Sequence, residues 1–266
     1  MSPLPVYQID AFTDQVFGGN PAAVCPLECW LDDSVMQQIA AENNLSETAF
    51  FVPTDNAGAG QFDLRWFTPK IEVDLCGHAT LASSFLIMSR LHPELDTLSF
   101  ETKSGQLNVS RDGDLLVLDF PARVPSPAVM PTGFVDAIGA EPVEFLKSIK
   151  NMAVYNDAAD VLKINPDFAY IADLDGDGLI VTAPGKDCDF VSRYFAPHAG
   201  IDEDPVTGSA HCTSVPYWAD RLGKNKLYAR QVSERGGELH CELVDDRVRM
   251  AGRAVLFMEG VIHLHD

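Results

Sequence analysis

Alternation of polar and apolar residues predicts strands in both halves of the chain. Residues 61–67 alternate as a half-buried strand does. Two further runs, 107–109 and 115–118, flank Asp112-Gly113, and this dipeptide favours a two-residue hairpin turn. In the second half, strands are predicted over residues 168–171, 179–181, 238–244 and 255–264.

Helical periodicity is confined to three segments. Val35, Met36, Ile39 and Ala40 share one helical face after Asp32, which is a suitable N-cap residue. Residues 78–90 are apolar all round and carry no charge before position 90, which predicts a helix buried at the centre of its domain. Residues 209–222 are similar but more polar, and we expect an interruption at Pro216 because proline lacks the backbone donor.

Residues 65–79 and 193–210 repeat one pattern. Each begins with Arg-aromatic-Phe-x-Pro, continues through an acidic stretch that starts with Ile, and ends in Gly-polar-Ala. Two copies predict two related halves that face each other, with a site between them. A proline-rich stretch, 121–131, separates the copies and reads as an extended linker. We therefore expect two domains, 1–122 and 123–266, with the last strand able to cross back.

The pattern favours an α+β fold in which each half wraps strands around one buried helix. Each repeated glycine, Gly77 and Gly208, precedes the N-terminus of that helix, where unpaired N–H groups and the helix dipole favour an anion. The simpler interpretation is that these glycines only permit tight turns. Because both glycines occur in the same sequence context, we favour the interpretation that they form an anion-binding site.

Groups able to carry protons cluster near these loops. His78 and Ser209 occupy equivalent positions of the repeat, and Asp74 and Asp204 lie just upstream. Glu47 stands where a helix is expected to end and an apolar strand to begin. A carboxylate against apolar surface has a raised pKa and suits proton transfer, whereas an arbitrary glutamate is usually solvated.

Four motifs in this order resemble the phenazine-biosynthesis-like isomerase family, the PhzF type. They are Gly18-Gly19-Asn20-Pro21-Ala22-Ala23-Val24, Asn44-Leu45-Ser46-Glu47-Thr48-Ala49-Phe50, Phe67-Thr68-Pro69 with Glu72-Val73-Asp74-Leu75-Cys76-Gly77-His78-Ala79-Thr80, and Glu203-Asp204-Pro205-Val206-Thr207-Gly208-Ser209-Ala210. The resemblance implies the diaminopimelate epimerase fold, with two pseudo-symmetric domains, each a strand-rich barrel around a central helix, and the site in the cleft between them.

The resemblance also implies roles for single residues. Glu47 matches the glutamate that removes a proton from a carbon and returns it elsewhere, and His78, Asp204 and Ser209 match further catalytic positions. Substrate binding would fall to Asn20, Ser46, Gly77, Ala79, Gly208 and Ala210. The implied reaction is a cofactor-independent isomerisation of a small carboxylated metabolite, and the family suggests a homodimer.

Two alternatives stay open at this point. Related racemases use two cysteines on opposite faces, but this chain has Cys76 at the first position and Thr207 at the second, and a threonine hydroxyl is no substitute for a thiol. A racemase or amino-acid epimerase that pairs Glu47 with Cys76 remains possible. The other alternative is a small-molecule-binding protein of the same fold without turnover.

Composition bears on location and partners. The formal charge of −20 disfavours nucleic acid and anionic membranes. The first residues carry no secretory signal pattern, so we expect six reduced cysteines and a cytoplasmic protein. No metal is expected, because the acidic loop 173–178 lacks the last ligand of a calcium loop. Zinc bound by Cys76, His78, His211 and Cys212 would block the anion site.

Overall fold

The structure is a computed structural model that describes residues 3–55 and 57–264. The chain forms two compact units, unit 1 with residues 1–119 and 251–266 and unit 2 with residues 120–250. The C-terminal segment belongs to unit 1 because β18 (Ala254–Ile262) pairs antiparallel with β1 (Leu4–Ala11). The sequence had placed the boundary after residue 122 and had allowed for such a crossing strand.

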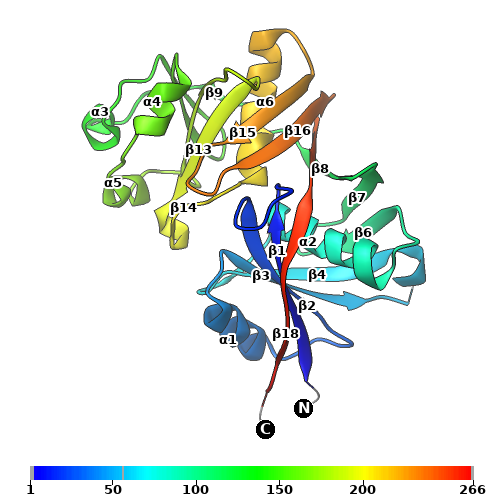
Figure 1. Ribbon diagram of the computed structural model, residues 1–266. Coiled ribbons are helices and arrows are strands. Elements are labelled where there is room, and N and C mark those ends of the chain that lie inside the picture. Colours follow the sequence, from blue (N-terminus) through cyan, green and yellow to red (C-terminus); the bar gives the residue numbers. More distant parts are fainter. Residues whose placement is uncertain (1–2, 56, 265–266) are drawn as a thin grey trace. The chain divides into compact units, whose positions relative to one another are not determined.

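Unit 1 contains a sheet with the strand order β18-β1-β2-β3-β4-β6-β7-β8 (Figure 1). The pairs β2–β3 and β4–β6 are parallel and the others antiparallel. A short strand, β5, pairs with the end of β4. The bounds are β2 (Asn20–Pro26), β3 (Glu47–Pro53), β4 (Gln61–Phe67), β5 (Glu72–Val73), β6 (Thr97–Glu101), β7 (Leu107–Asp112) and β8 (Leu115–Pro121).

Unit 2 repeats this topology with the order β9-β10-β11-β12-β13-β15-β16. Its parallel pairs are β11–β12 and β13–β15, and the short β14 pairs with the end of β13. The internal repeat of the sequence is therefore a repeat of strand pairing. The bounds are β9 (Ser126–Pro127), β10 (Glu144–Lys147), β11 (Asn151–Val154), β12 (Leu179–Pro184), β13 (Phe190–Ala196), β14 (Ile201–Glu203), β15 (Lys226–Gln231), β16 (Gly237–Val244) and β17 (Arg247–Gly252).

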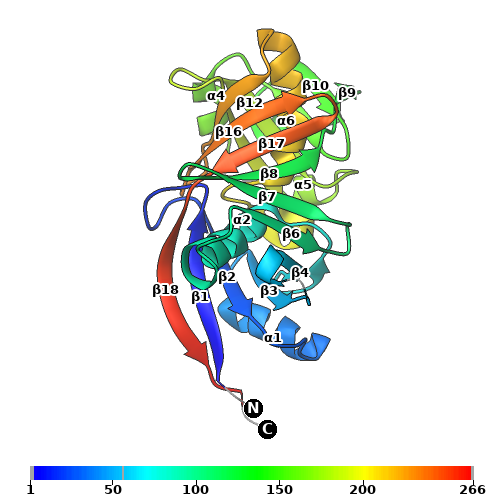
Figure 2. The same cartoon turned by 90° about the vertical axis from the view of Figure 1, so that its right-hand side faces the viewer.

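A buried helix follows the short strand in each unit, α2 (Gly77–Leu86) after β5 and α6 (Gly208–Leu222) after β14. In unit 1, α2 lies against β1, β2 and β3 (Figure 1 and Figure 2). The helix buries three hydroxyl side chains, Thr80, Ser83 and Ser84. Each hydroxyl is hydrogen-bonded, because it donates to a backbone carbonyl one turn earlier in the helix. The predicted central helices are thus present, and α2 continues as a π-helical turn, Ile87–Leu91.

The interruption expected at Pro216 is wrong, because α6 continues through this residue. Proline cannot donate to the carbonyl of Cys212, which would otherwise be left unpaired in the buried helix. The backbone N–H of Arg123 donates to that carbonyl instead, at 2.8 Å. A contact from a distant part of unit 2 therefore makes the proline tolerable.

The strand predicted over residues 168–171 is also wrong, since these residues form helix α5 (Phe168–Ala172). The side chain of Asp167 caps the helix by accepting from the N–H groups of Ala169 and Tyr170. Local capping outweighs the strand propensity of Phe, Tyr and Ile. The acidic loop 173–178, which would be a hairpin turn if residues 168–171 were a strand, instead joins α5 to β12.

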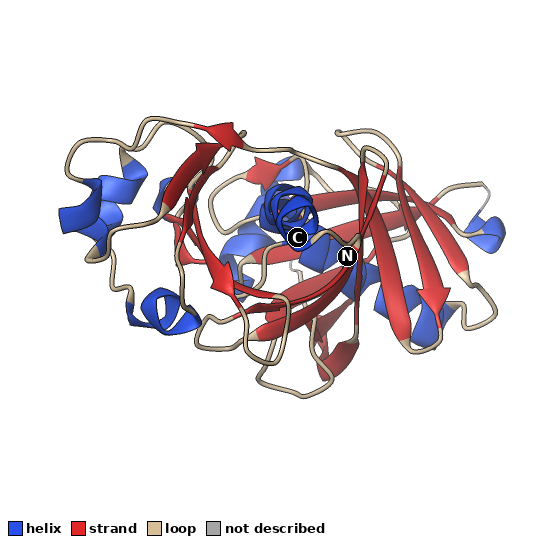
Figure 3. Ribbon diagram, turned by 90° about the horizontal axis from the view of Figure 1, so that it is seen from above, coloured by secondary structure: helices blue, strands red, loops and turns tan. Residues whose placement is uncertain are grey.

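The remaining helices are short apart from one. They are α1 (Asp33–Asn43), α3 (Phe134–Ile138), α4 (Ala158–Lys163) and the 3-10 turns Ala57–Ala59 and Pro197–Ala199. Strands clearly predominate over helices (Figure 3). Among the described residues, no helix has the length and apolar character needed to cross a membrane.

Candidate active site

Glu47 is the first residue of β3 and lies four residues after the last residue of α1, Asn43. The next residue, Asn44, caps the helix, because its left-handed backbone (φ 50°) lets its N–H return to the carbonyl of Ala40. In the parallel pairing of β2 with β3, Glu47 lies opposite Ala22. Its side chain is 13% exposed, so the carboxylate is mostly, but not fully, removed from solvent.

His78 lies in the first turn of α2 and presents Nε2 to Glu47, with 3.2 Å between Nε2 and Oε2. Burial lowers the pKa of His78 to about 3. The ring is therefore neutral near pH 7, and the contact places a neutral imidazole against a carboxylate rather than joining two opposite charges. This pair is the part of the predicted site that unit 1 brings together.

Asn20 contacts the other nitrogen of the same ring. It is fully buried at the start of β2, and its Nδ2 lies 3.1 Å from Nδ1 of His78. The preceding Gly19 has φ +60°, and a Cβ there would lie 2.1 Å from the carbonyl oxygen of Ala11. Glycine is therefore required to direct Asn20 into the site.

Cys76 is the residue immediately before α2, and its Sγ lies 3.5 Å from Nδ1 of His78. One ligand atom from each of Glu47, Cys76 and His78 lies within 4.8 Å of the others, so these residues form a group that could hold a metal ion. Glu47 and Cys76, however, contact different nitrogens of one imidazole, and one ion cannot bind both nitrogens. The arrangement fits proton transfer better than metal binding.

The other residues predicted in unit 1 lie beside this group. Gly77 and Ala79 belong to the first turn of α2, where backbone N–H groups have no acceptor within the helix. Ser46 is half-buried and directly precedes Glu47. The sequence motif identified all these positions, but it gave no sign that Asn20 and Cys76 would meet the imidazole.

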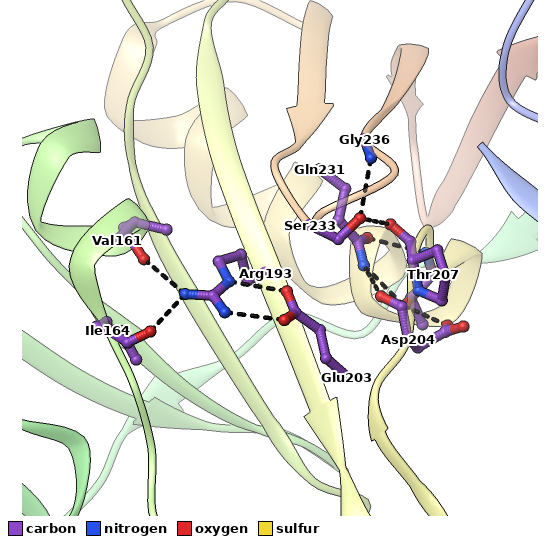
Figure 4. A network of polar contacts seen from close by, with 10 residues as sticks. Val161, Ile164, Arg193, Glu203, Asp204, Thr207, Gln231, Ser233 and Gly236 are labelled. Atoms are coloured by element: carbon purple, nitrogen blue, oxygen red, sulfur yellow. Dashed lines mark hydrogen bonds and ion pairs between the residues drawn. The ribbon is translucent and has the colours of Figure 1, made fainter. Parts of the chain in front are cut away.

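In unit 2, the predicted Asp204 belongs to a buried hydrogen-bond network (Figure 4). Thr207 donates from Oγ1 to Asp204 Oδ2 at 2.5 Å. Gln231 accepts from the Thr207 N–H at 2.8 Å and donates to the Asp204 carbonyl at 2.7 Å. Gln231 is 1% exposed, and sequence reasoning missed it because it lies on β15, outside the motif.

The first turn of α6 carries the other predicted residues of unit 2. Ser209 is half-buried, and Gly208 and Ala210 on either side are buried. Thr207 precedes this helix as Cys76 precedes α2. The two positions are thus structurally equivalent, as the repeat predicted, but the threonine hydroxyl is committed to Asp204.

A buried lysine lies near Asp204 and was also missed. Lys150 is 8% exposed and donates to the hydroxyl of Tyr194 at 2.9 Å. Burial lowers the pKa of Lys150. The backbone carbonyl of Tyr194 accepts from the Asp204 N–H at 3.0 Å. Tyr194, on β13, therefore contacts Asp204 through its backbone and Lys150 through its hydroxyl. A lysine at the turn between two strands carries no sequence signal for such a position.

Comparison with known proteins places the chain among a group of similar sequences and structures. The family model described as phenazine biosynthesis-like protein matches residues 9–260. An uncharacterised isomerase of Pseudomonas aeruginosa is 49% identical over 261 residues, covering 98% of this chain and 99% of the relative. A crystal structure of a PhzF-family phenazine biosynthesis protein from Enterococcus faecalis is 46% identical, with TM-score 0.94 and coverage of 98% and 100%.

A hydroxyproline epimerase of Agrobacterium vitis has the same fold at much lower identity. Its structure matches with TM-score 0.66 and 10% identity, covering 99% of this chain and 93% of that one. The chain therefore has the epimerase-like fold that the resemblance implied.

Proposed function

Because the chain belongs to the phenazine biosynthesis-like protein family, we propose that it is an isomerase that moves a proton within a small carboxylated metabolite by acid–base catalysis, without a cofactor. The contact between Glu47 Oε2 and His78 Nε2, at 3.2 Å, carries the proposal. It places a mostly buried carboxylate against a neutral imidazole in a fixed position, which suits a base that takes a proton from carbon in a defined direction.

In the proposed reaction, the Glu47 carboxylate takes a proton from one carbon of the substrate, and the electron pair of that C–H bond moves into the conjugated system of the substrate. Glu47, now a carboxylic acid, returns the proton to another carbon, so the isomerisation is balanced without oxidant or reductant. His78 stays neutral and restricts the position of the carboxylate by contacting it at 3.2 Å. The N–H groups in the first turn of α2, which have no acceptor within the helix, suit a carboxylate of the substrate.

We assign substrate binding to unit 2, because it too offers N–H groups at the N-terminus of a helix. The first turn of α6 offers backbone N–H groups and the half-buried hydroxyl of Ser209. Asp204 accepts from Thr207, so its carboxylate is held in one orientation and can accept a further hydrogen bond from a substrate amine or hydroxyl.

A two-base racemase is the second candidate, favoured by the position of Cys76 beside His78. At the equivalent position of unit 2, Thr207 donates to Asp204 and is no base. The two-thiol reaction is therefore disfavoured, while inversion by Glu47 and Cys76 would require both groups for turnover. A binding protein without turnover would show ligand affinity and no product.

The homodimeric state and the cytoplasmic location are part of the proposal by analogy with the family. Light scattering at micromolar concentrations tests the first, and a monomer over the whole range would contradict it.

The decisive experiment compares Glu47→Gln with Glu42→Gln, an exposed glutamate of the neighbouring helix α1. A screen of metabolites that raise the melting temperature supplies the substrate, because a ligand of the native state stabilises it. Glu47→Gln keeps the shape of the side chain but removes its basicity. Turnover should therefore fall by about 10²–10⁴-fold or more, while the affinity for the ligand changes little. Glu42→Gln should behave as the parent protein. Retained turnover in Glu47→Gln would remove Glu47 from the mechanism.

A further inference from the structure

The two nitrogens of His78 face groups of opposite kind. Nε2 lies 3.2 Å from a carboxylate oxygen of Glu47, and Nδ1 lies 3.1 Å from Nδ2 of Asn20. A carboxylate oxygen accepts hydrogen bonds, whereas an amide NH₂ only donates them. A neutral imidazole has one donor and one acceptor nitrogen, and this environment fits only the form with the hydrogen on Nε2.

We infer that Asn20 is a positioning residue that fixes the tautomer of His78: by donating to Nδ1 it keeps the hydrogen on Nε2, the nitrogen that faces Glu47. This role rests on the proposed function of Glu47 as base, and it differs from the substrate contact that the sequence motif implied for Asn20.

The opposite orientation of the Asn20 amide is inconsistent with an ionised Glu47. It would turn Oδ1 toward Nδ1, so the hydrogen would have to sit on Nδ1. The lone pair of Nε2 would then face the Glu47 carboxylate at 3.2 Å, placing two acceptors against each other in a buried site. Cys76 supports the first orientation, because its Sγ lies 3.5 Å from Nδ1 and a thiol is a weak donor.

The assignment has a consequence for the proton. With hydrogen already on Nε2, His78 offers Glu47 no lone pair. A proton taken from the substrate therefore does not pass from Glu47 into the imidazole. Asn20 would in this way keep the transferred proton available for return to the substrate.

His211 provides an internal reference of the opposite kind. Its ring is fully buried, and its Nδ1 lies 2.8 Å from the carbonyl oxygen of Thr207, which only accepts. The hydrogen of His211 must therefore be on Nδ1. Burial lowers the pKa of His211 to about 4 and that of His78 to about 3, so both rings are neutral in the same sample near pH 7.

Nitrogen-15 NMR of the imidazoles tests the inference without any substrate. Two-bond correlations from the ring protons distinguish a protonated from a bare nitrogen, and His78→Gln and His211→Gln identify the two sets of signals. We expect protonated Nε2 with bare Nδ1 in His78 and the reverse in His211. Protonated Nδ1 in His78 would overturn the inference.

Two variants separate Asn20 from Glu47 as the cause. In Glu47→Gln the tautomer of His78 should persist, because Asn20 still donates; a switch would show that Glu47 sets it. In Asn20→Asp the new carboxylate accepts from Nδ1, so the form protonated only on Nε2 should disappear, and its persistence would contradict the inference. If Asn20→Asp does not fold, the parent protein and Glu47→Gln still decide.

Kinetics with an identified substrate then distinguish positioning from binding. Asn20→Asp should lower kcat by about 10²-fold or more with KM little changed, because the altered group acts through His78. A raised KM with unchanged kcat would return Asn20 to the substrate contacts. Failure of Glu47→Gln to lose turnover would instead contradict the proposed function, whatever the tautomer of His78.

Discussion

Arg193 donates two hydrogen bonds to Glu203, from Nε to Oε1 and from Nη2 to Oε2, both at 2.8 Å (Figure 4). The equivalent pair in unit 1 is Arg65 with Glu72, joined by the same atoms at 2.7 and 2.9 Å. Each pair ties the long strand of the repeat to the short strand that leads to the glycine loop. The repeated sequence thus places the same Arg–Glu pair in each unit, where it stabilises the short strand before the glycine loop.

This Arg–Glu pair yields a prediction of stability. Arg193 also donates from Nη1 to the carbonyls of Val161 and Ile164, so Arg193→Lys leaves several partly buried acceptors without a donor. We expect a loss of about 3 kcal/mol in the free energy of unfolding, measured by urea denaturation. The control is Arg230→Lys, whose partner Glu238 is as exposed as Arg230 itself. That change should cost less than about 1 kcal/mol.

The buried histidines predict how stability depends on pH. Burial lowers the pKa of His78 to about 3 and of His211 to about 4, while unfolded histidine titrates near 6.5. Between these values the unfolded chain binds more protons, so stability falls as the pH drops below about 6.5. From pH 7.5 to 5.5 the loss should be about 1.4 kcal/mol for each histidine.

Urea denaturation at the two pH values measures this loss, and His211→Gln should remove about half of it. Hydrogen bonding to Arg65 lowers the pKa of Glu72, so the contribution of Glu72 is lost only below its unfolded pKa, near 4.3, outside this window. Equal stability at pH 7.5 and 5.5 would show that the rings are not held neutral.

Cys76→Ala distinguishes the isomerase from a thiol racemase. No thiol stands at the equivalent Thr207, and Cys76 contacts His78 only as a weak partner of Nδ1. We expect turnover within about tenfold of the parent protein, in contrast to the far larger loss for Glu47→Gln. A fall of several orders of magnitude with an unchanged melting temperature would favour inversion by Glu47 and Cys76.

Gln231 should support the Asp204 loop more strongly than its neighbours do. Gln231→Leu leaves the Thr207 N–H and the Asp204 carbonyl buried without this partner, at a cost of about 1–3 kcal/mol each. Ser233→Ala, which removes a partly buried hydrogen bond to the Pro205 carbonyl and another from the Gly236 N–H, should cost about 1–2 kcal/mol. Urea denaturation of both variants checks the order, and equal effects would contradict the role of Gln231.

Sequence alone identified the elements that depend on local pattern. The alternation at β4, the hairpin between β7 and β8, and the apolar run of α2 each encode their structure within a few residues, although the turn falls on Gly113-Asp114, one residue later than predicted. The repeat predicted equivalent helices with Cys76 and Thr207 at equivalent ends. Glu47 and His78 were identified through motifs, because each lies within a short segment of fixed spacing.

Tertiary structure decided what depends on contacts between distant segments. Pro216 stays helical because Arg123, far away in sequence, satisfies the carbonyl of Cys212. Gln231 reaches Asp204 from another strand, and Asn20 meets His78 although 58 residues separate them. A sequence pattern specifies which face a side chain occupies, but the partner of a buried polar atom is fixed only when packed elements exclude water and leave one donor or acceptor within reach.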